Sequence, residues 1–298
     1  MIRYVVRQGH TYTIDEFLAG WGRPLRASIQ VTPYESLGGA TLATAGGVCL
    51  FSDIERLDGA ERARMTALAD DLVGQGVRVL NHPMRVLTRY PLLRLLADVG
   101  INRFRARRMV VSPRLRYPVF LRTDHAHDGN LTPLLTGRRQ LLRALLGLAR
   151  HPRRLRSRLR EGLLAVEFED TRDAAGLYRK YSVLRVGNAF VPRHAFVSRT
   201  WMLKQADIVD AHTAAAEQAF VRDNPHREQV ARVFVLAGID YGRMDYSVRS
   251  DGSIVVWEIN TNPMVVPDVS RLDPLRVESQ SLSAAQVVEA FRALDATS

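Results

Sequence analysis

The sequence predicts an α+β protein in which a small N-terminal α/β lobe precedes a larger, sheet-rich lobe. Three observations support this expectation. Residues 1 to about 105 alternate β-like runs with helical periods, the chain beyond them returns to paired strand patterns, and 46% of the 298 residues are hydrophobic. A chain of this length and composition can bury a sizeable core. We expect domains at residues 1–105 and 106–298.

The N-terminal lobe is predicted from short runs rich in Val, Ile and Phe, each bounded by Gly, Pro or polar residues. These runs are "RYVVR", "ASIQVT", "GGVCLFSDI" and "VRVLN". Residues 59–74 have the apolar spacing of a helix, carried by Met65, Leu68, Ala69 and Leu72. A second helix is expected over residues 85–100, and Cys49 is expected in a buried strand.

The second lobe begins with "YPVFLRTDHAHDGN", which reads as a strand that enters a polar turn. A basic helical stretch follows over residues 138–162. Strands are then expected in "GLLAVEFED" and "YRKYSVLRVGNAFV", and a helical region from about 211 to 237. "YGRMDYSVRSDGSIVVWEIN" has the pattern of a hairpin with its turn at "RSDGS". The tail after about residue 270 leaves its structure open.

The chain is strongly basic, with a net charge of +11, and 40 of its 42 basic residues are arginines because only two are lysines. This balance favours anionic partners without naming one. Nine arginines lie between Arg138 and Arg160. They form either a cationic face that recruits an acidic partner or an ordinary solvated helix face. Nucleic acid is a poor fit, because this stretch lacks the interleaved aromatic residues that stack on bases.

Targeting signals and cysteine pairs do not stand out in this sequence. No apolar run approaches the roughly 20 residues of a membrane span, and the polar start "MIRYVVRQGH" differs from a secretory signal. A single cysteine forms no internal disulfide, which fits a reducing compartment. We therefore expect a cytoplasmic protein that does not enter a membrane.

The predicted hairpin gathers oxygen ligands. Glu258 and Asn260 lie one residue apart on the returning strand, so the two-residue period of a strand puts them on one face. A turn at residues 251–252 places Asp245 opposite Glu258 or nearly so. Such hard oxygens suit Mg²⁺ that keeps contacts with water and phosphates. The alternative is that these groups line the wet face of an edge hairpin.

The segment "GRMDYSVRSDGSIVVWEINTNP" resembles the C-terminal metal-binding signature of the ATP-grasp enzymes. That family includes D-alanine:D-alanine ligase and the ribosomal-protein glutamate ligases. The resemblance implies an ATP-grasp fold, in which two α+β lobes sandwich ATP, preceded by a small pre-ATP-grasp-like domain. It also implies that Asp245, Glu258 and Asn260 hold Mg²⁺ on ATP and that Arg243 faces the developing charge.

Weaker similarities extend the resemblance upstream. By analogy with the family's two basic residues, Arg89 and Arg122 would contact the nucleotide, and Gly129 lies in the loop that covers the phosphates. "LLAVEFED" is similar to the segment that reads the adenine, with Glu167 and Phe168 beside it. The chain departs from the family here, because both basic residues are usually Lys and the loop is usually richer in Gly.

Several further residues have two interpretations. His125 and His127 could bind a metal, but without a nearby Cys or third His a solvated loop is the simpler reading. Arg193 and His194 lie where related enzymes contact the acceptor, and Trp201 and Lys204 share that possibility with ordinary structural roles.

The resemblance implies a cytoplasmic, ATP- and Mg²⁺-dependent ligase that activates a carboxylate as an acyl phosphate for attack by an amine. Two alternatives stay open. A degenerate ATP-grasp regulator would bind ATP without turnover and would explain the missing lysines. A basic nucleic-acid-binding protein would explain the charge.

Overall fold

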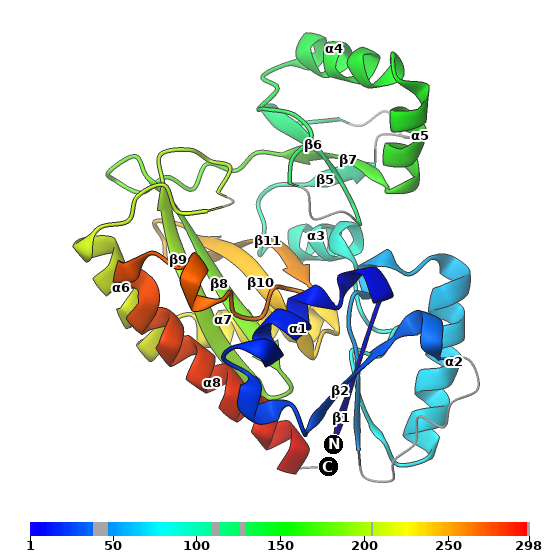
Figure 1. Ribbon diagram of the computed structural model, residues 1–298. Helices are drawn as coiled ribbons and strands as arrows, with labels where there is room; N and C mark the ends of the chain where they lie inside the picture. The colour runs from blue at the N-terminus through cyan, green and yellow to red at the C-terminus, as the bar shows by residue number, and fades with distance from the viewer. Residues whose placement is uncertain (38–46, 109–113, 126–128, 204, 297–298) are drawn as a thin grey trace.

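The described residues form three β-sheets and the helices that cover them (Figure 1). The computed structural model describes residues 1–37, 47–108, 114–125, 129–203 and 205–296. Short 3₁₀ turns connect several elements: η1 (Gln8–His10), η2 (Arg23–Leu25), η3 (Tyr34–Ser36), η4 (Ile54–Arg56), η5 (Val269–Arg271) and η6 (Pro274–Arg276).

The first sheet is parallel and has the strand order β2-β1-β3-β4. Its strands are β1 (Ile2–Val6), β2 (Ile29–Pro33), β3 (Val48–Phe51) and β4 (Arg78–Leu80). Helix α1 (Tyr12–Ala19) follows β1, and α2 (Gly59–Gly74) connects β3 to β4. The α2 helix begins at a capping box of Asp58 and Glu61, and its Met65, Ala69 and Leu72 are buried as predicted. Cys49 is buried in β3, also as predicted.

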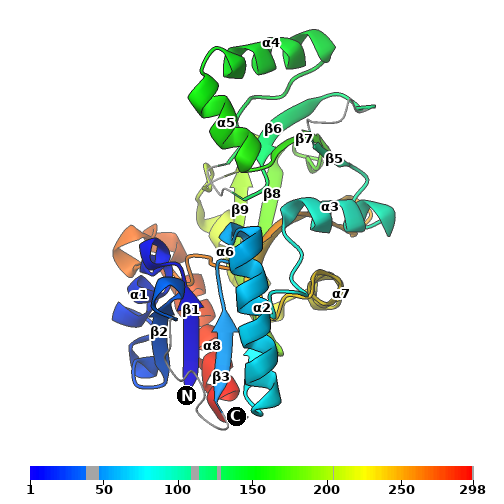
Figure 2. The ribbon, with the colours of Figure 1, turned by 90° about the vertical axis from the view of Figure 1, so that its right-hand side faces the viewer.

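The second sheet is antiparallel, with the order β5-β7-β6, and stands at the top of the molecule with α4 and α5 (Figure 2). Its strands are β5 (Ala106–Arg108), β6 (Val119–Thr123) and β7 (Leu163–Glu167). The expected basic helix over residues 138–162 is in fact two helices, α4 (Arg138–Ala149) and α5 (Pro152–Arg160). A proline has no N–H to continue the helical ladder, so the helix ends before Pro152 and a new one begins there.

The third sheet has the order β11-β10-β8-β9, and every neighbouring pair is antiparallel. It contains β8 (Tyr178–Val186), β9 (Ala189–Ser198), β10 (Tyr241–Val248) and β11 (Ile254–Asn260). The helices around it are α3 (Arg89–Asp98), α6 (Ala211–Asp223), α7 (Arg227–Ala237) and α8 (Val277–Ala296). The predicted helical region 211–237 is interrupted at Asn224, which adopts a left-handed conformation (φ 44°).

The first and third sheets share their hydrophobic core. Phe51 and Met65 belong to the same buried cluster as Val183, Phe234 and Met244. A second shared cluster contains β1, β8 and α8 residues. The N-terminal sheet is therefore packed firmly against the sheet that carries the hairpin. The boundary near residue 105 stays a prediction.

Helix α8 occupies the tail whose structure the sequence left open. It packs on β9 and α6, and it buries Val287, Phe291 and Leu294 together with the polar Gln280 and Ser283. None of the helices in the described part of the chain combines the length and apolar character needed to cross a lipid bilayer.

Candidate functional site

The hairpin β10–β11 brings two carboxylates face to face. Asp245 pairs directly with Glu258 in the strand register, which confirms the register predicted from the sequence. The turn is closed by a hydrogen bond from the Arg249 N–H to the Ser253 carbonyl, with Gly252 at a φ of 78°. Side chains that are directly opposite on antiparallel strands share one face, so both carboxylates point to the same side of the sheet.

Asp245 is buried among groups that favour its ionised form. It accepts a hydrogen bond from the Ser182 hydroxyl at 2.9 Å, and it forms ion pairs with Lys180 at 3.3 Å and Arg243 at 3.2 Å. Burial acts to raise the pKa of Asp245, but Lys180 and then Arg243 outweigh it, so the pKa lies below its usual value. The side chain is therefore a carboxylate at neutral pH.

Glu258 holds two guanidinium groups on one oxygen. Arg122, from β6, donates to Oε2 at 2.8 Å, and Arg89, from α3, donates to the same atom. Arg89 also donates to the carbonyls of Thr123 and Asp124, at 2.5 and 2.9 Å. Burial and then the nearby Arg89 lower the pKa of Arg122 to about 10, which leaves it charged at neutral pH.

Among the described residues, the cluster around the two carboxylates carries excess positive charge. Four cations of this part of the chain, namely Arg89, Arg122, Lys180 and Arg243, face two anions, Asp245 and Glu258. The difference of two charges lies in a largely buried setting, where electrostatic interactions are stronger than in water. Such a cluster attracts an anionic ligand.

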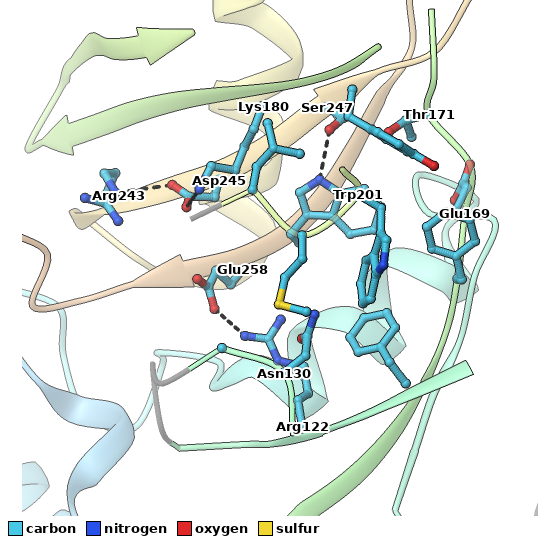
Figure 3. A pocket seen from close by; sticks show the side chains of 17 residues that line it. Arg122, Asn130, Glu169, Thr171, Lys180, Trp201, Arg243, Asp245, Ser247 and Glu258 are labelled. Atoms are coloured by element: carbon cyan, nitrogen blue, oxygen red, sulfur yellow. Dashed lines mark hydrogen bonds and ion pairs between the residues drawn. The ribbon is translucent and has the colours of Figure 1, made fainter. Parts of the chain in front are cut away.

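A cavity of about 340 Å³ extends from this cluster to an aromatic wall (Figure 3). Trp201 and Trp257 line it, with the Trp257 indole N–H donating to Ser247 at 3.0 Å. The Trp201 ring lies 5.0 Å from the ring of Phe120 and 5.6 Å from that of Phe168. One end of the cavity suits a flat apolar ring and the other suits anionic groups, which together are the features of a nucleotide.

Most of the site residues predicted from the sequence come together in this cavity. Its lining includes Arg122, Gly129, Phe168, Arg243, Asp245 and Glu258. Gly129 has a φ of 92°, a conformation that favours glycine. Arg89 does not line the cavity but reaches it through Glu258.

Glu167 and Asn260 are engaged elsewhere and are not part of the lining. The Glu167 carboxylate accepts hydrogen bonds from the backbone N–H groups of Arg105 and Arg116, at 3.1 and 3.0 Å. The Asn260 side-chain oxygen accepts from the Asn262 N–H at 2.7 Å. The nucleotide role of Glu167 and the metal role of Asn260 stay predictions.

Asn262 joins the end of the hairpin to the N-terminal sheet. Its side-chain oxygen accepts hydrogen bonds from Thr13 at 2.7 Å, Ser52 at 3.0 Å and Tyr4 at 3.1 Å. All three donors are buried. This amide is therefore part of a structural network that fixes where β11 ends.

The remaining sequence candidates are not gathered at the cavity, apart from Trp201. Arg193 is buried and donates to Ser283 of α8, and His194 stacks on Phe196 with ring centroids 3.9 Å apart. Burial, and then the nearby Arg243 and Lys180, lower the pKa of His194 well below its usual value. His125 lines a second cavity, whereas His127 and Lys204 lie outside the described residues.

Lys180 is the site residue that sequence reasoning missed. The feature of the sequence that could have pointed to Lys180 is the rarity of lysine, since the chain has two lysines and 40 arginines. Lys180 also lies on β8 two residues before Ser182, so both face Asp245 across the strand pair. The aromatic wall was predicted only in part. The resemblance placed Phe168 beside the adenine and offered Trp201 as an acceptor contact, whereas Phe120 and Trp257 gave no signal, because the four rings come from separate segments.

The described residues offer few protein ligands to a divalent metal. Within the described ranges, no group of three His, Cys, Asp or Glu side chains has the arrangement of a metal site. The two carboxylates of the hairpin nevertheless fit Mg²⁺ that takes its remaining ligands from water and nucleotide phosphates. A metal bound between Asp245 and Glu258 would therefore depend on the nucleotide.

Comparison with known proteins identifies the fold. No protein-family model and no curated protein sequence matches the chain. Among solved structures, VanG D-Ala:D-Ser ligase from Enterococcus faecalis is similar with a TM-score of 0.54 and 10% identity, over 99% of this chain and 98% of that one. The ATP-grasp ligase PsnB, in complex with a phosphomimetic variant of its minimal precursor, Mg and ADP, has a TM-score of 0.52 and 13% identity, over 96% of each chain. The chain has the ATP-grasp fold, as its hairpin motif predicted.

Proposed function

We propose, starting from the ATP-grasp fold of this chain, that it is an ATP-dependent ligase that joins a carboxylate to an amine. The observation that carries the proposal is the cluster of four cations around Asp245 and Glu258 at the end of an aromatic cavity. Solved structures with the same fold include ligases. Their low identity leaves the activity of this chain as a proposal.

The chemistry proceeds in two steps. The γ-phosphoryl group of ATP passes to an oxygen of the substrate carboxylate, and the bond to ADP breaks. The amine nitrogen then attacks the acyl carbon of the acyl phosphate, phosphate leaves, and the nitrogen loses a proton. The first step spreads negative charge over the transferred group, so positioned cations accelerate it.

The residues of the site have separate tasks. Arg89 and Arg122 pair with Glu258 and can transfer these hydrogen bonds to phosphate oxygens. Arg243 lies beside Asp245, where it can offset charge on the transferred group. Phe168 and Trp201 form the wall against which an adenine ring packs. Mg²⁺ held by Asp245 and Glu258, with Asn260 as a further expected ligand, would supply charge neutralisation between neighbouring phosphates.

An ATP-binding regulator without turnover is the second candidate. One observation favours it. The two residues that donate to the Glu258 carboxylate are arginines, whereas the resemblance leads us to expect lysines at both positions. Arginine binds phosphates through a planar fork and lysine through a compact charge, so the two place a phosphate differently. This candidate binds ATP as the ligase does but releases no ADP.

ADP release measured against pools of carboxylic acids and amines separates the two candidates. A ligase forms ADP only when both substrates are present, whereas a regulator forms none with any pair. Glu258→Gln should lower the rate by a factor of about 100 or more, as for the loss of a group that organises transition-state charge. Asp251→Asn removes the same charge from the exposed turn of the same hairpin and should leave the rate unchanged.

We expect the enzyme to act in the cytoplasm, as the sequence led us to predict. We also expect the arginine-rich helices α4 and α5 to attract an acidic partner.

A further inference from the structure

A second cavity, of about 790 Å³, lies between the N-terminal sheet and helix α5. Its N-terminal wall comes from residues that follow β1 and β3, including Arg7 and Arg56. Its other wall is α5, with Arg153, Arg156 and Arg160. The chain at the end of β6 reaches both cavities, because Arg122 lines the first and His125, three residues further on, lines the second. Five arginines therefore surround a space adjacent to the proposed nucleotide site.

The two walls differ in how their arginines are paired. On the N-terminal wall, Arg7 forms an ion pair with Glu61, and Arg56 pairs with Asp53 at 3.2 Å. The three lining arginines of α5, Arg153, Arg156 and Arg160, are exposed, and they form no ion pair within the described ranges of the chain. Since they recur at intervals of three and four residues, they share one face of the helix.

The acidic residues of the lining do not neutralise the α5 row, which consists of Arg153, Arg156 and Arg160. Glu161 is bound to Arg158 at 2.7 Å, and Asp58 caps α2 through the Glu61 N–H at 2.8 Å. Glu55 accepts a hydrogen bond from the Thr261 hydroxyl. Because each lining carboxylate already has a partner, the charge of the α5 row is available to a ligand.

We propose that this cavity binds an acidic peptide segment, which delivers a substrate group to the neighbouring nucleotide site. The proposal rests on the ligase function proposed above. The row from Arg153 to Arg160 covers about 10 Å along the helix, given a rise of 1.5 Å per residue. An extended peptide covers this length with about three residues. Several carboxylates along one peptide can therefore meet the row, whereas a small dicarboxylic acid meets only part of it.

The lining also distinguishes a peptide from a nucleic acid. It contains no Phe, Tyr or Trp, so it lacks the large aromatic rings on which the bases of single strands stack most strongly. A basic surface of this kind is suited to side-chain carboxylates, which arginine binds through two parallel hydrogen bonds.

Fluorescence anisotropy of a labelled hexaglutamate peptide at low salt tests the proposal. The triple variant R153Q/R156Q/R160Q should bind at least tenfold more weakly than the wild type. The matched control is R138Q/R139Q/R143Q, which removes the same charge from exposed positions of α4 that do not line the cavity. This control should lose less than threefold in affinity for the peptide. Equal losses in the two variants overturn the proposal, because they indicate attraction by net charge alone.

Competition identifies the ligand and separates this proposal from the proposed function. Hexaglutamine and succinate should displace the labelled peptide poorly, and saturating MgATP should not displace it. Displacement by MgATP, or by succinate at equal carboxylate concentration, overturns the peptide site. Thermal melts establish that both variants fold. Because no turnover is needed, peptide binding without ADP release contradicts the ligase alone, and ADP release without peptide binding contradicts the cavity alone.

Discussion

Two buried clusters contain arginines and carboxylates, yet they differ in charge balance. Between α6 and α8, the single carboxylate of Glu217 accepts hydrogen bonds from Arg276, Ser279 at 2.8 Å and Gln280 at 2.7 Å. At the hairpin, the Glu258 carboxylate is shared by Arg89 and Arg122. In the first cluster, one guanidinium and two neutral donors contact the carboxylate, and the buried Arg193 is bound to Ser283 and Gln280 instead. In the second, two guanidinium groups contact the carboxylate directly.

The difference teaches how a structural cluster is distinguished from a binding cluster. A buried ion pair that is also hydrogen-bonded by neutral groups leaves little for a ligand to gain. Two guanidinium groups that share one carboxylate gain much favourable interaction energy when a phosphate binds beside them. We therefore infer that the Glu217 cluster anchors α8, and that the Glu258 cluster is held ready for an anion. The predictions below test this contrast.

The largest expected effect is on stability, at the structural cluster. Glu217→Ala leaves the guanidinium of Arg276 without its buried partner, which should lower the free energy of unfolding by about 3–5 kcal/mol. Urea denaturation measures the change. Glu289→Ala, which removes an exposed carboxylate of α8, is the control and should cost far less. ATP affinity of the folded Glu217→Ala protein should equal that of the wild type, and a large loss of affinity would show that the two clusters are not separate.

The next effect is on ATP affinity, at the binding cluster. Arg122→Ala should weaken ATP binding by about 1.5–3 kcal/mol, the range for hydrogen bonds to charged groups. Arg122→Lys should recover much of the loss at pH 7. The lysine, however, would be subject to the burial and the Arg89 charge that lower the pKa of Arg122. Its pKa should therefore lie below the usual value of about 10.4, so its ATP affinity should fall from pH 7 to 9 while that of the wild type stays level. Calorimetric titration of ATP at both pH values measures these differences. Equal ATP affinities for the wild type, Arg122→Ala and Arg122→Lys would show that Arg122 does not contact the nucleotide.

A smaller effect concerns the stability of the unliganded binding cluster. Glu258→Gln removes the carboxylate charge that two buried guanidinium groups both contact, and it should lower the free energy of unfolding by roughly 2 kcal/mol. The sequence alone suggests the opposite sign, because the only charge known to lie near Glu258 is then the like charge of Asp245. Urea denaturation of the two proteins without ligand settles the sign. An increase in stability would mean that the Asp245 repulsion exceeds the pairing with both arginines.

The sequence predicted much of the fold and the local part of the site. Alternation and turn residues were sufficient for the strands of the hairpin and for the register of Asp245 with Glu258. The contacts of Glu258 with Arg89 and Arg122 join residues that are 169 and 136 positions apart, which no local spacing records. These contacts, not the hairpin, determine the charge balance at Glu258.

Two helices and one strand escaped prediction for physical reasons. Helix α8 buries Gln280 and Ser283 in hydrogen bonds, so its buried face does not read as an apolar stripe. Helix α1 is only 8 residues long, and β5 has 3 residues. Such short elements contain too few periods for a pattern to emerge.

The smallest effect is a dependence of stability on pH. The pKa of His194 is lowered by burial and then by Arg243 and Lys180, so the folded protein disfavours its protonated form. Below pH 6.5 the unfolded chain takes up this proton first, and stability is lost as the pH falls. From pH 6.5 to 5.5 the wild type should lose about 1 kcal/mol more than His194→Gln. Thermal melts across this range measure the difference. Parallel losses in the two proteins would show that His194 titrates normally.

The most direct test of the central claim is calorimetric titration of ATP, with Mg²⁺ or with EDTA, into the wild type and Glu258→Gln. Because Asp245 and Glu258 are proposed to hold Mg²⁺ only together with nucleotide phosphates, Mg²⁺ should tighten ATP binding to the wild type by at least tenfold. It should change binding to Glu258→Gln by less than twofold. In EDTA the variant should bind ATP at least as tightly as the wild type, since one negative charge near the phosphates is gone. A full Mg²⁺-dependent gain in Glu258→Gln would contradict the account.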